Sequence, residues 1–364
     1  MHGVRPVASP VPKPPSAPRR RGLRAILSRN EPERTSMSIP IVSGRRDPLV
    51  KVAPHIFRID LPVTEVLPTT NSYIVIGPER SLLIDAGLNI PESKDALDLA
   101  LSKLNVSWRD VDVFLTHSDL DHAAGLTQIA RQTMRVYSGM TDFRQRSIPI
   151  MRGEVFVGIV ERICRDHDTP FSFDRDWWAP MRDRGTDDIL VTTVREGDTL
   201  DVGDYHFEVI ATPGHEPSHL CLFDEASGVF VAGDHVIGDS YPSVVLSSDT
   251  DELGLYLDSL KKIRDYPARL VLTGHGEEFT DLAGRVDQIL GHYERQLANM
   301  REILDTGITD VAEIVYATTC RPRRKPWVER PLFGQMALVG ATMTYLKHLV
   351  ATGEYPDQYD IVHK

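Results

Sequence analysis

The chain of 364 residues is long enough for one large or two modest domains, and its 41% hydrophobic and 26% charged residues are ordinary for a globular protein. No apolar run approaches the ~20 residues that a membrane helix needs, so we expect no membrane partner. The net charge of −11 argues against nucleic acid as a partner, because phosphate contacts need a basic surface.

The N-terminal segment has a different composition from the rest. Residues 1–30 carry seven Lys or Arg and no acidic residue, and subtracting that +7 leaves −18 for the remainder. Six prolines fall within the first eighteen positions. Such a segment cannot bury a core, so we expect a disordered basic extension over residues 1–45. It lacks the apolar stretch of about 7–15 residues of a secretory signal. A transit peptide, a bacterial extension and a start at Met37 remain alternatives.

Secondary structure becomes readable from about residue 50. Two apolar runs in 71–87 (NSYIVIGPERSLLIDAG) indicate a hairpin, and 93–104 has apolar residues at helical spacing. A short buried strand is expected at 111–116, followed by a helix from Ala123 and a further strand at 135–139. The segment 140–190 is expected to be mostly helical with loops.

The second half repeats this theme and then becomes helical. We expect a strand over 206–215, a hairpin over 219–235 and a strand over 268–277. After these, helical spacing dominates, over 283–304, 309–318 and 334–355.

The three cysteines, Cys164, Cys221 and Cys320, are far apart and form no CxxC pair. Their odd number and spacing argue against a disulfide framework and fit a reducing compartment. We therefore expect a cytoplasmic protein.

The segment 116–125 (THSDLDHAAG) concentrates metal-binding residue types. His117, Asp119, Asp121 and His122 follow an expected strand. In a loop, His117 and Asp119 could bind one ion while Asp121 and His122 bind a neighbouring one. Imidazole and carboxylate together suit Zn, Fe or Mn.

Three more candidate ligands, His215, Asp234 and His275, each follow another expected strand. Functional side chains in sheet proteins gather at the ends of strands. An aspartate between two cations can bridge them, and Asp234, preceded by Gly233, is the candidate for that role. The alternative is a set of surface or core residues without a ligand, which the density of the cluster argues against.

These elements resemble the metallo-β-lactamase superfamily of hydrolases. Asp85 in LIDAG, then HSDLDH, TPGH, AGD and TGHG occur in the order of that family's pattern, between about residues 50 and 280. The resemblance implies an α/β fold, an αββα sandwich of two mixed sheets with a dinuclear site at one edge. It implies a catalytic domain over 46–280 and a helical, winged-helix-like C-terminal subdomain over 281–364.

The resemblance also assigns ligands. The first metal would be held by His117, Asp119, His215 and Asp234, and the second by Asp121, His122, Asp234 and His275. Asp85 would fix a ligand histidine from behind, as metal-bound imidazoles require. Within the superfamily, TPGHEPSHLCL is similar to the TPGHxxGH stretch of the glyoxalase II-like branch, with Ser218 for a glycine and His219 as a structural residue. The family usually has histidine where Asp119 stands.

The implied reaction is hydrolysis of a thioester, ester or lactone by a metal-activated hydroxide. Asp121 is the catalytic candidate that orients the water and takes its proton. We expect two divalent metal ions, Zn or, given the hard oxygen ligand of Asp119, Fe or Mn. No GxSxG elbow or P-loop is present. The alternatives are an iron-dependent oxidoreductase of the same fold and a phosphodiesterase or nuclease.

The substrate is expected to be a small molecule, and a homodimer is compatible with the sequence. Candidate substrate residues are Tyr241, His235, Trp177, Trp178 and Arg182. The two tryptophans could equally be core residues, as aromatic side chains usually are. The region 140–190 and the tail after 280 are expected to shape the substrate pocket.

Overall fold

The computed structural model describes residues 49–63, 69–140, 153–173, 189–244, 246, 250–320 and 324–357. All of them lie in one compact unit, Pro40–Lys364. The extension 1–45 and the side chains of Trp177, Trp178 and Arg182 lie outside the described residues, so those expectations stay predictions. Among the described residues, no helix has the length and apolar composition needed to cross a membrane.

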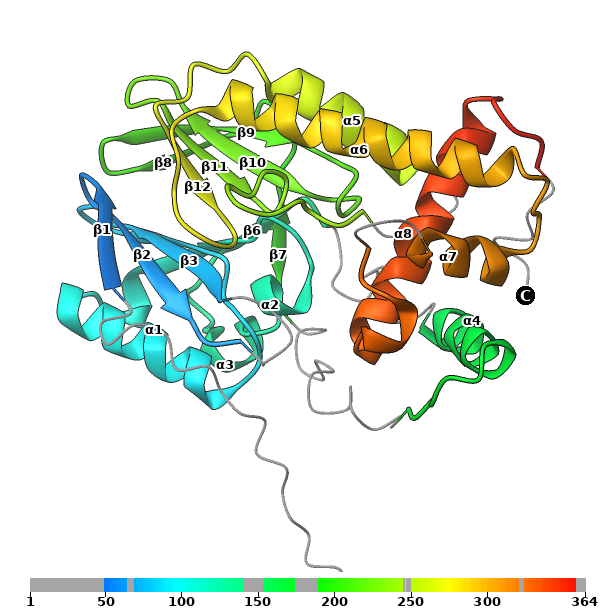
Figure 1. Cartoon of the computed structure of the whole chain (residues 1–364). Coiled ribbons are helices and arrows are strands. Elements are labelled where there is room, and N and C mark those ends of the chain that lie inside the picture. Colours follow the sequence, from blue (N-terminus) through cyan, green and yellow to red (C-terminus); the bar gives the residue numbers. More distant parts are fainter. Residues whose placement is uncertain are drawn as a thin grey trace, which may run out of the picture. The chain divides into compact units, whose positions relative to one another are not determined.

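Two sheets form the centre of the molecule (Figure 1). The first has seven strands in sequence order; β1 to β4 pair antiparallel, and β4 to β7 pair parallel. The second has five strands in the order β12-β11-β10-β9-β8, with only β11 and β12 parallel. The strands are β1 (Leu49–Ala53), β2 (Ile56–Leu61), β3 (Thr70–Val75), β4 (Ser81–Ile84), β5 (Val111–Phe114), β6 (Val136–Ser138), β7 (Val191–Thr193), β8 (Thr199–Val202), β9 (Tyr205–Ala211), β10 (Leu220–Asp224), β11 (Val229–Gly233) and β12 (Leu270–Thr273).

The inner faces of the two sheets share one apolar layer. Alternate residues of a strand point to opposite faces. On β4, Leu82 and Ile84 face the second sheet, whereas Leu83 packs on the outer side. On β10, Leu222 faces inward and Phe223 outward. Both faces of these strands are therefore buried, which explains their nearly continuous apolar sequences.

Helices cover both outer faces (Figure 1). Residues of α1 and α3 pack on the first sheet, and α5, α6 and α8 pack on the second. The result is the αββα sandwich that the family resemblance implies. The helices are α1 (Pro91–Leu104), α2 (Leu120–Ala123), α3 (Leu126–Ile129), α4 (Gly153–Asp166), α5 (Glu252–Ile263), α6 (Leu282–Leu304), α7 (Val311–Thr319) and α8 (Leu332–Ala351), with 3-10 turns at Trp108–Asp110 and Trp327–Glu329.

The expected C-terminal helical extension is confirmed. Its helices α7 and α8 pack with α4 around a separate apolar cluster. Trp327 is the largest side chain of this cluster, and its Nε1 lies 3.4 Å from the Cys164 Sγ of α4. Helix α4 and the tail therefore pack against each other, although they are distant in sequence.

Some boundaries differ from expectation. The helix expected from Ala123 begins at Leu120, and the sequence pattern gives no sign of β1, β2, β7 or β8. Strand β2 shows the reason, because Arg58 interrupts its apolar pattern yet is only 1% exposed. Arg58 Nε lies 2.6 Å from Asp60 Oδ1 and Nη1 lies 2.7 Å from Glu278 Oε2. Paired charges can be buried, and apolar patterning cannot detect them.

Candidate metal centre

The candidate ligands lie on four segments, which follow β5, β9, β11 and β12, and the supporting Asp85 follows β4. In the segment after β5, Asp121 and His122 belong to the short helix α2. Parallel pairing of β4 with β5, and of β11 with β12, brings their carboxyl ends together. The two sheets pack face to face, so the loops of both reach one edge.

Asp85 anchors the loop after β5. It adopts a positive φ of 61°, which aspartate tolerates better than most residues. Its Oδ1 accepts a hydrogen bond from the Thr116 backbone N–H at 2.8 Å, and its Oδ2 lies 2.8 Å from both Thr116 Oγ1 and His122 Nδ1. These contacts fix the ring of His122 with Nε2 pointing away from Asp85, as in carboxylate-supported metal sites.

Asp119 stands at the N-cap of α2, yet its side chain does not cap the helix. Its Oδ2 instead lies 3.7 Å from His117 Nε2 and 3.5 Å from His215 Nε2. The carboxylate is 34% exposed, whereas the His117 side chain is fully buried. The carboxylate of Asp119 thus points toward two imidazole nitrogens instead of the N-terminus of α2, as expected of a metal ligand.

Asp234 lies at the centre of the cluster. Its Oδ1 is 3.4 Å from His122 Nε2, and its Oδ2 is 3.8 Å from His215 Nε2 and 3.2 Å from His275 Nε2. The absence of a side chain at Gly274 makes room for this carboxylate, because a Cβ there would lie 2.1 Å from Asp234 Oδ1. Asp234 is thus the one carboxylate among the described residues that touches both halves of the site, as a bridging ligand would.

The second half of the site is completed by Asp121 and His275. His275 Nε2 lies 3.4 Å from Asp121 Oδ2, and its Nδ1 lies 3.0 Å from the Thr69 carbonyl oxygen. The Thr70 hydroxyl donates to Asp121 Oδ2 at 3.1 Å. Both ligand candidates are therefore held from behind by the start of β3.

The buried polar atoms test whether the site fits a metal. The Nε2 atoms of His117, His122 and His215, and Oδ1 of Asp234, are buried without a hydrogen-bond partner. An unsatisfied buried polar group costs about 1–3 kcal/mol, and here four such atoms converge. The Nδ1 atoms are all engaged, that of His117 with Thr116 Oγ1 at 2.9 Å and that of His215 with the Ser243 carbonyl oxygen at 2.6 Å.

The candidate ligand atoms form two separate groups, and within each group the atoms lie within 4.8 Å of one another. One group joins His117, His215 and Asp234, and another joins Asp121, His122 and His275. Imidazole nitrogens with carboxylate oxygens are the donor set of Zn, Fe and Mn sites. The residues present therefore fit a divalent metal ion.

The carboxylates also change the acidity of the imidazoles. Burial opposes protonation of His215, but its contact with Asp119 raises the pKa to about 9. Burial likewise opposes protonation of His275, but the charge of Asp234 raises the pKa of this imidazole to about 9. Ligand imidazoles must be neutral, so a metal ion competes with protons at this site.

Three other candidates occupy different environments. His219 is buried, with Nδ1 2.8 Å from Thr212 Oγ1, as expected of a structural residue. His235 is fully buried, and burial lowers its pKa to about 3, so a substrate could reach it only if its surroundings moved. Tyr241 is 44% exposed, and its ring stacks on that of His292, with centroids 3.9 Å apart.

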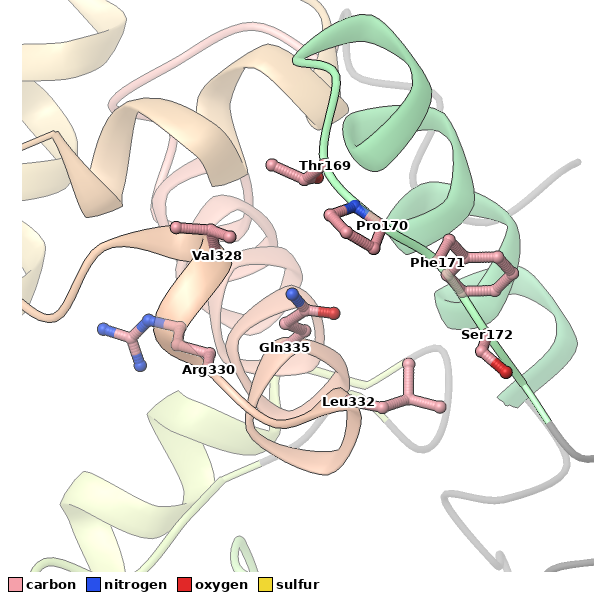
Figure 2. Close-up of a pocket in the computed structure, with 8 residues that line it drawn as sticks. All are labelled: Thr169, Pro170, Phe171, Ser172, Val328, Arg330, Leu332 and Gln335. Carbon is pink, nitrogen blue, oxygen red and sulfur yellow. The ribbon is translucent and has the colours of Figure 1, made fainter.

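A pocket of about 200 Å³ lies in the helical extension rather than at the metal cluster (Figure 2). The segment after α4 faces the 3-10 turn and the start of α8 across it (Figure 2). No candidate ligand lines it; the lining residues are Thr169, Pro170, Phe171, Ser172, Val328, Arg330, Leu332 and Gln335. Both regions expected to shape a substrate pocket contribute to this lining.

The sequence pattern misses the residues that hold the ligands in place. Thr69 and Ser243 act through backbone carbonyl groups, which have no side-chain signature. Thr70 and Thr116 act through hydroxyl groups. For Thr116, only its position beside His117 could have indicated a role.

A sequence profile described as the metallo-beta-lactamase superfamily matches residues 67–137 and 156–275. A probable metallo-hydrolase of Bacillus subtilis (strain 168), YqjP, is 27% identical over 256 residues, covering 64% of this chain and 75% of that protein. An atrochrysone carboxyl ACP thioesterase of Emericella nidulans is 27% identical over 239 residues, covering 65% of this chain and 60% of that protein. Another atrochrysone carboxyl ACP thioesterase, AacuM of Aspergillus aculeatus, is 26% identical over 218 residues, covering 59% of this chain and 53% of that protein. The matched parts span less than two thirds of both thioesterases.

Solved structures show the same fold. A metallo-beta-lactamase family protein of Thermus thermophilus matches with a TM-score of 0.64 and 25% identity, covering 83% of this chain and 95% of that one. A beta-lactamase domain protein of Burkholderia ambifaria matches with a TM-score of 0.64 and 20% identity, covering 87% of this chain and 95% of that one. The high coverage extends the likeness beyond residues 67–275 into the helical extension.

Proposed function

This chain belongs to the metallo-beta-lactamase superfamily, and from that premise we propose that it is a two-metal hydrolase of a small acyl thioester, with esters and lactones as related substrates. The observation that carries this proposal is the convergence of three orphaned imidazole nitrogens and one orphaned carboxylate oxygen at one buried edge. No other group of described residues places so many unpartnered donor atoms together.

The first cation would be held by His117, Asp119, His215 and Asp234, and the second by Asp121, His122, Asp234 and His275. Two divalent cations held there would acidify a water molecule and polarise the acyl carbonyl. Zinc, iron and manganese all suit this donor set, and Asp119 favours the harder ions.

The chain's own residues position the reaction. Asp121 Oδ2 accepts from the Thr70 hydroxyl and is the oxygen that faces His122 and His275, so we assign the other oxygen, Oδ1, to the attacking water, from which it accepts a proton. Asp85 keeps His122 oriented through its Nδ1, and the Thr69 and Ser243 carbonyl groups do the same for His275 and His215. These fixed contacts mean that little reorganisation is needed when the substrate binds.

The thioester is favoured by the chemistry of the leaving group and by the named relatives. A thiol has a pKa near 8.5 and can leave as a thiolate, so no side chain has to protonate it. The nitrogen of an amide would need such an acid, and the described imidazoles of the site are all candidate ligands. Two relatives are named as ACP thioesterases, which supports the same class for this chain.

We place the part of the substrate that does not react in the pocket between the segment after α4 and the start of α8 (Figure 2). Its lining combines apolar side chains with the Arg330 guanidinium, which suits an acyl chain or carrier arm with a polar end. The TPGHEPSH stretch supports a glyoxalase II-like arrangement of the loop after β9.

The experiment is metal analysis of the full-length protein, followed by a panel of thioester, lactone, β-lactam and phosphodiester substrates. We expect about two transition-metal ions per chain, and thioester hydrolysis that a chelator abolishes. Chelator-resistant hydrolysis or a metal content near zero would refute the proposal. Iron without hydrolysis would favour the oxidoreductase alternative, and phosphodiester cleavage would favour a nuclease.

A further inference from the structure

Behind the first set of ligands lies a small cluster of polar side chains, formed by the buried Ser118 and Glu216 and the half-buried Ser218. The Ser118 hydroxyl donates to Glu216 Oε1 at 3.2 Å. The Ser218 backbone N–H and hydroxyl donate to Glu216 Oε2 at 2.8 and 2.7 Å. One carboxylate thus joins two loops that are 98 positions apart in the sequence.

The two loops are those that carry the first set of ligands. Ser118 lies between His117 and Asp119, and Glu216 directly follows His215. The backbone of Glu216 also organises its own loop, because its carbonyl oxygen accepts from Gly214 N at 3.3 Å and His219 N at 3.2 Å. Any movement of Glu216 would therefore shift three ligand candidates together.

The hydrogen bond that joins the two loops, from Ser118 to Glu216, lies between buried residues. Ser118 and Glu216 are each 6% exposed. A buried carboxylate that loses its hydrogen-bond donors has little water to replace them, whereas an exposed one would be resolvated at small cost. The bonds of Glu216 are consequently suited to hold a fixed loop geometry.

We infer that Glu216 is a positioning residue for the first metal: its carboxylate sets the spacing between the loop of His117 and Asp119 and the loop of His215. This inference rests on the proposed metal site and adds a residue that makes no metal contact. Residues that hold ligands from behind typically change metal affinity about 10–100-fold when removed. The second set, held by Asp85, Thr69 and Thr70, should not depend on Glu216.

Two variants of Glu216 distinguish the effect of its hydrogen bonds from the effect of its negative charge. Glu216→Ala removes all three hydrogen bonds, while Glu216→Gln removes the charge but keeps the shape, an acceptor for Ser218 and a polar partner for Ser118. We expect zinc titration of metal-depleted Glu216→Ala, against a chromophoric chelator, to show one site weakened about 10–100-fold and one site unchanged. Glu216→Gln should bind two zinc ions within a few-fold of the wild type.

Asp224 provides a matched control. Its carboxylate is also buried and accepts from the Ser227 N–H at 2.8 Å and the Ser227 hydroxyl at 2.6 Å. It is the last residue of β10, at the opposite end of that strand from the loop of His215. Asp224→Ala should lower the melting temperature and leave both zinc affinities unchanged.

The results that would overturn the inference are specific. Glu216→Ala binding two zinc ions as tightly as the wild type would show that the position is unimportant. Glu216→Gln losing zinc as severely as Glu216→Ala would show that charge acts instead. If Glu216→Ala does not fold, Ser118→Ala, which removes only the bond between the loops, must weaken one zinc site about 2–10-fold or the inference fails. Wild-type protein that binds no zinc, iron or manganese would contradict the proposed function itself.

Discussion

The two halves of the candidate metal centre are supported in different ways. In the second half, Asp121, His122 and His275 are each held by a residue of the first sheet or its loops, namely Thr70, Asp85 and Thr69. In the first half, His117 and His215 are held by Thr116 and Ser243. The carboxylate of Asp119 lies near these two imidazoles but is 34% exposed. If two cations bind as proposed, the second would be held by side chains that are all fixed from behind, whereas the first would depend on the partly exposed carboxylate of Asp119.

Removing Asp234 should abolish the difference between the halves, because Asp234 contacts both. We expect Asp234→Ala to lose both metals and to lower kcat/KM by on the order of 10³-fold or more, beyond the loss from one oxyanion donor. Metal content by mass spectrometry and thioester kinetics measure this. Retention of one tightly bound metal would show that the halves are independent of Asp234.

Asp119 allows the first half to be tested alone. Asp119→Ala should lose one metal and most of the activity, on the order of 10²-fold. Asp119→His should keep two metals but shift the preference toward zinc, because a softer nitrogen replaces a hard oxygen. Competition between zinc and manganese, measured for both variants and the wild type, reports the shift. If Asp119→Ala keeps the full metal content and the wild-type rate of hydrolysis, Asp119 is not a ligand.

The second half should weaken when its outer support is removed. Asp85→Asn keeps the shape but weakens the acceptor for His122 Nδ1, so affinity for one metal should fall about 10–100-fold. Chelator competition with Asp85→Asn and Asp119→Ala side by side tests whether different sites are affected. The same site lost in both variants would contradict the division into halves.

The metal-free protein should depend on pH in a defined window. The folded state raises the pKa of His215 and His275 to about 9, above the unfolded value near 6.5. Their stabilisation is therefore complete below about pH 6.5 and is lost as the pH rises to 9. Urea unfolding of chelated protein at pH 6.5 and 9 should show a decrease on the order of a few kcal/mol. Equal free energies of unfolding at pH 6.5 and pH 9 would show that the protonation of His215 and His275 does not contribute to stability. The metal-loaded protein, measured at the same two pH values, is the control.

The smallest effect is expected outside the metal centre. Val328 is 59% exposed and lines the pocket of the helical extension, so Val328→Trp should fill that pocket without disturbing the core. KM for a long-chain thioester should rise a few-fold, while metal content and KM for acetyl thioesters stay the same, since added bulk removes binding space only. Exposed Leu190→Trp is a control away from the pocket lining. An unchanged KM for every chain length would remove the pocket from the substrate site.

Much of the architecture could be predicted because it depends on local pattern. The hairpin of β3 and β4, the helix α1 and the long helices α6 and α8 follow from apolar spacing within one segment. Strand β2 could not be recognised, since Arg58 is buried through partners that include Glu278, distant in the chain. Likewise, Trp327 and Cys164 meet only because α4 packs against the tail.

By itself, the sequence determined which residue types can act as ligands and that each follows a strand, because motif order and strand pattern are local properties of the chain. Tertiary structure decided which of them meet. Only the packing of the two sheets brings His215 to Asp119 and places Asp234 between His122 and His275. It also decided what supports them, because Ser243, Thr69 and Glu216 act through backbone carbonyl groups or across 98 positions of sequence. Such contacts depend on how distant segments are brought together in the fold, which residue spacing does not encode.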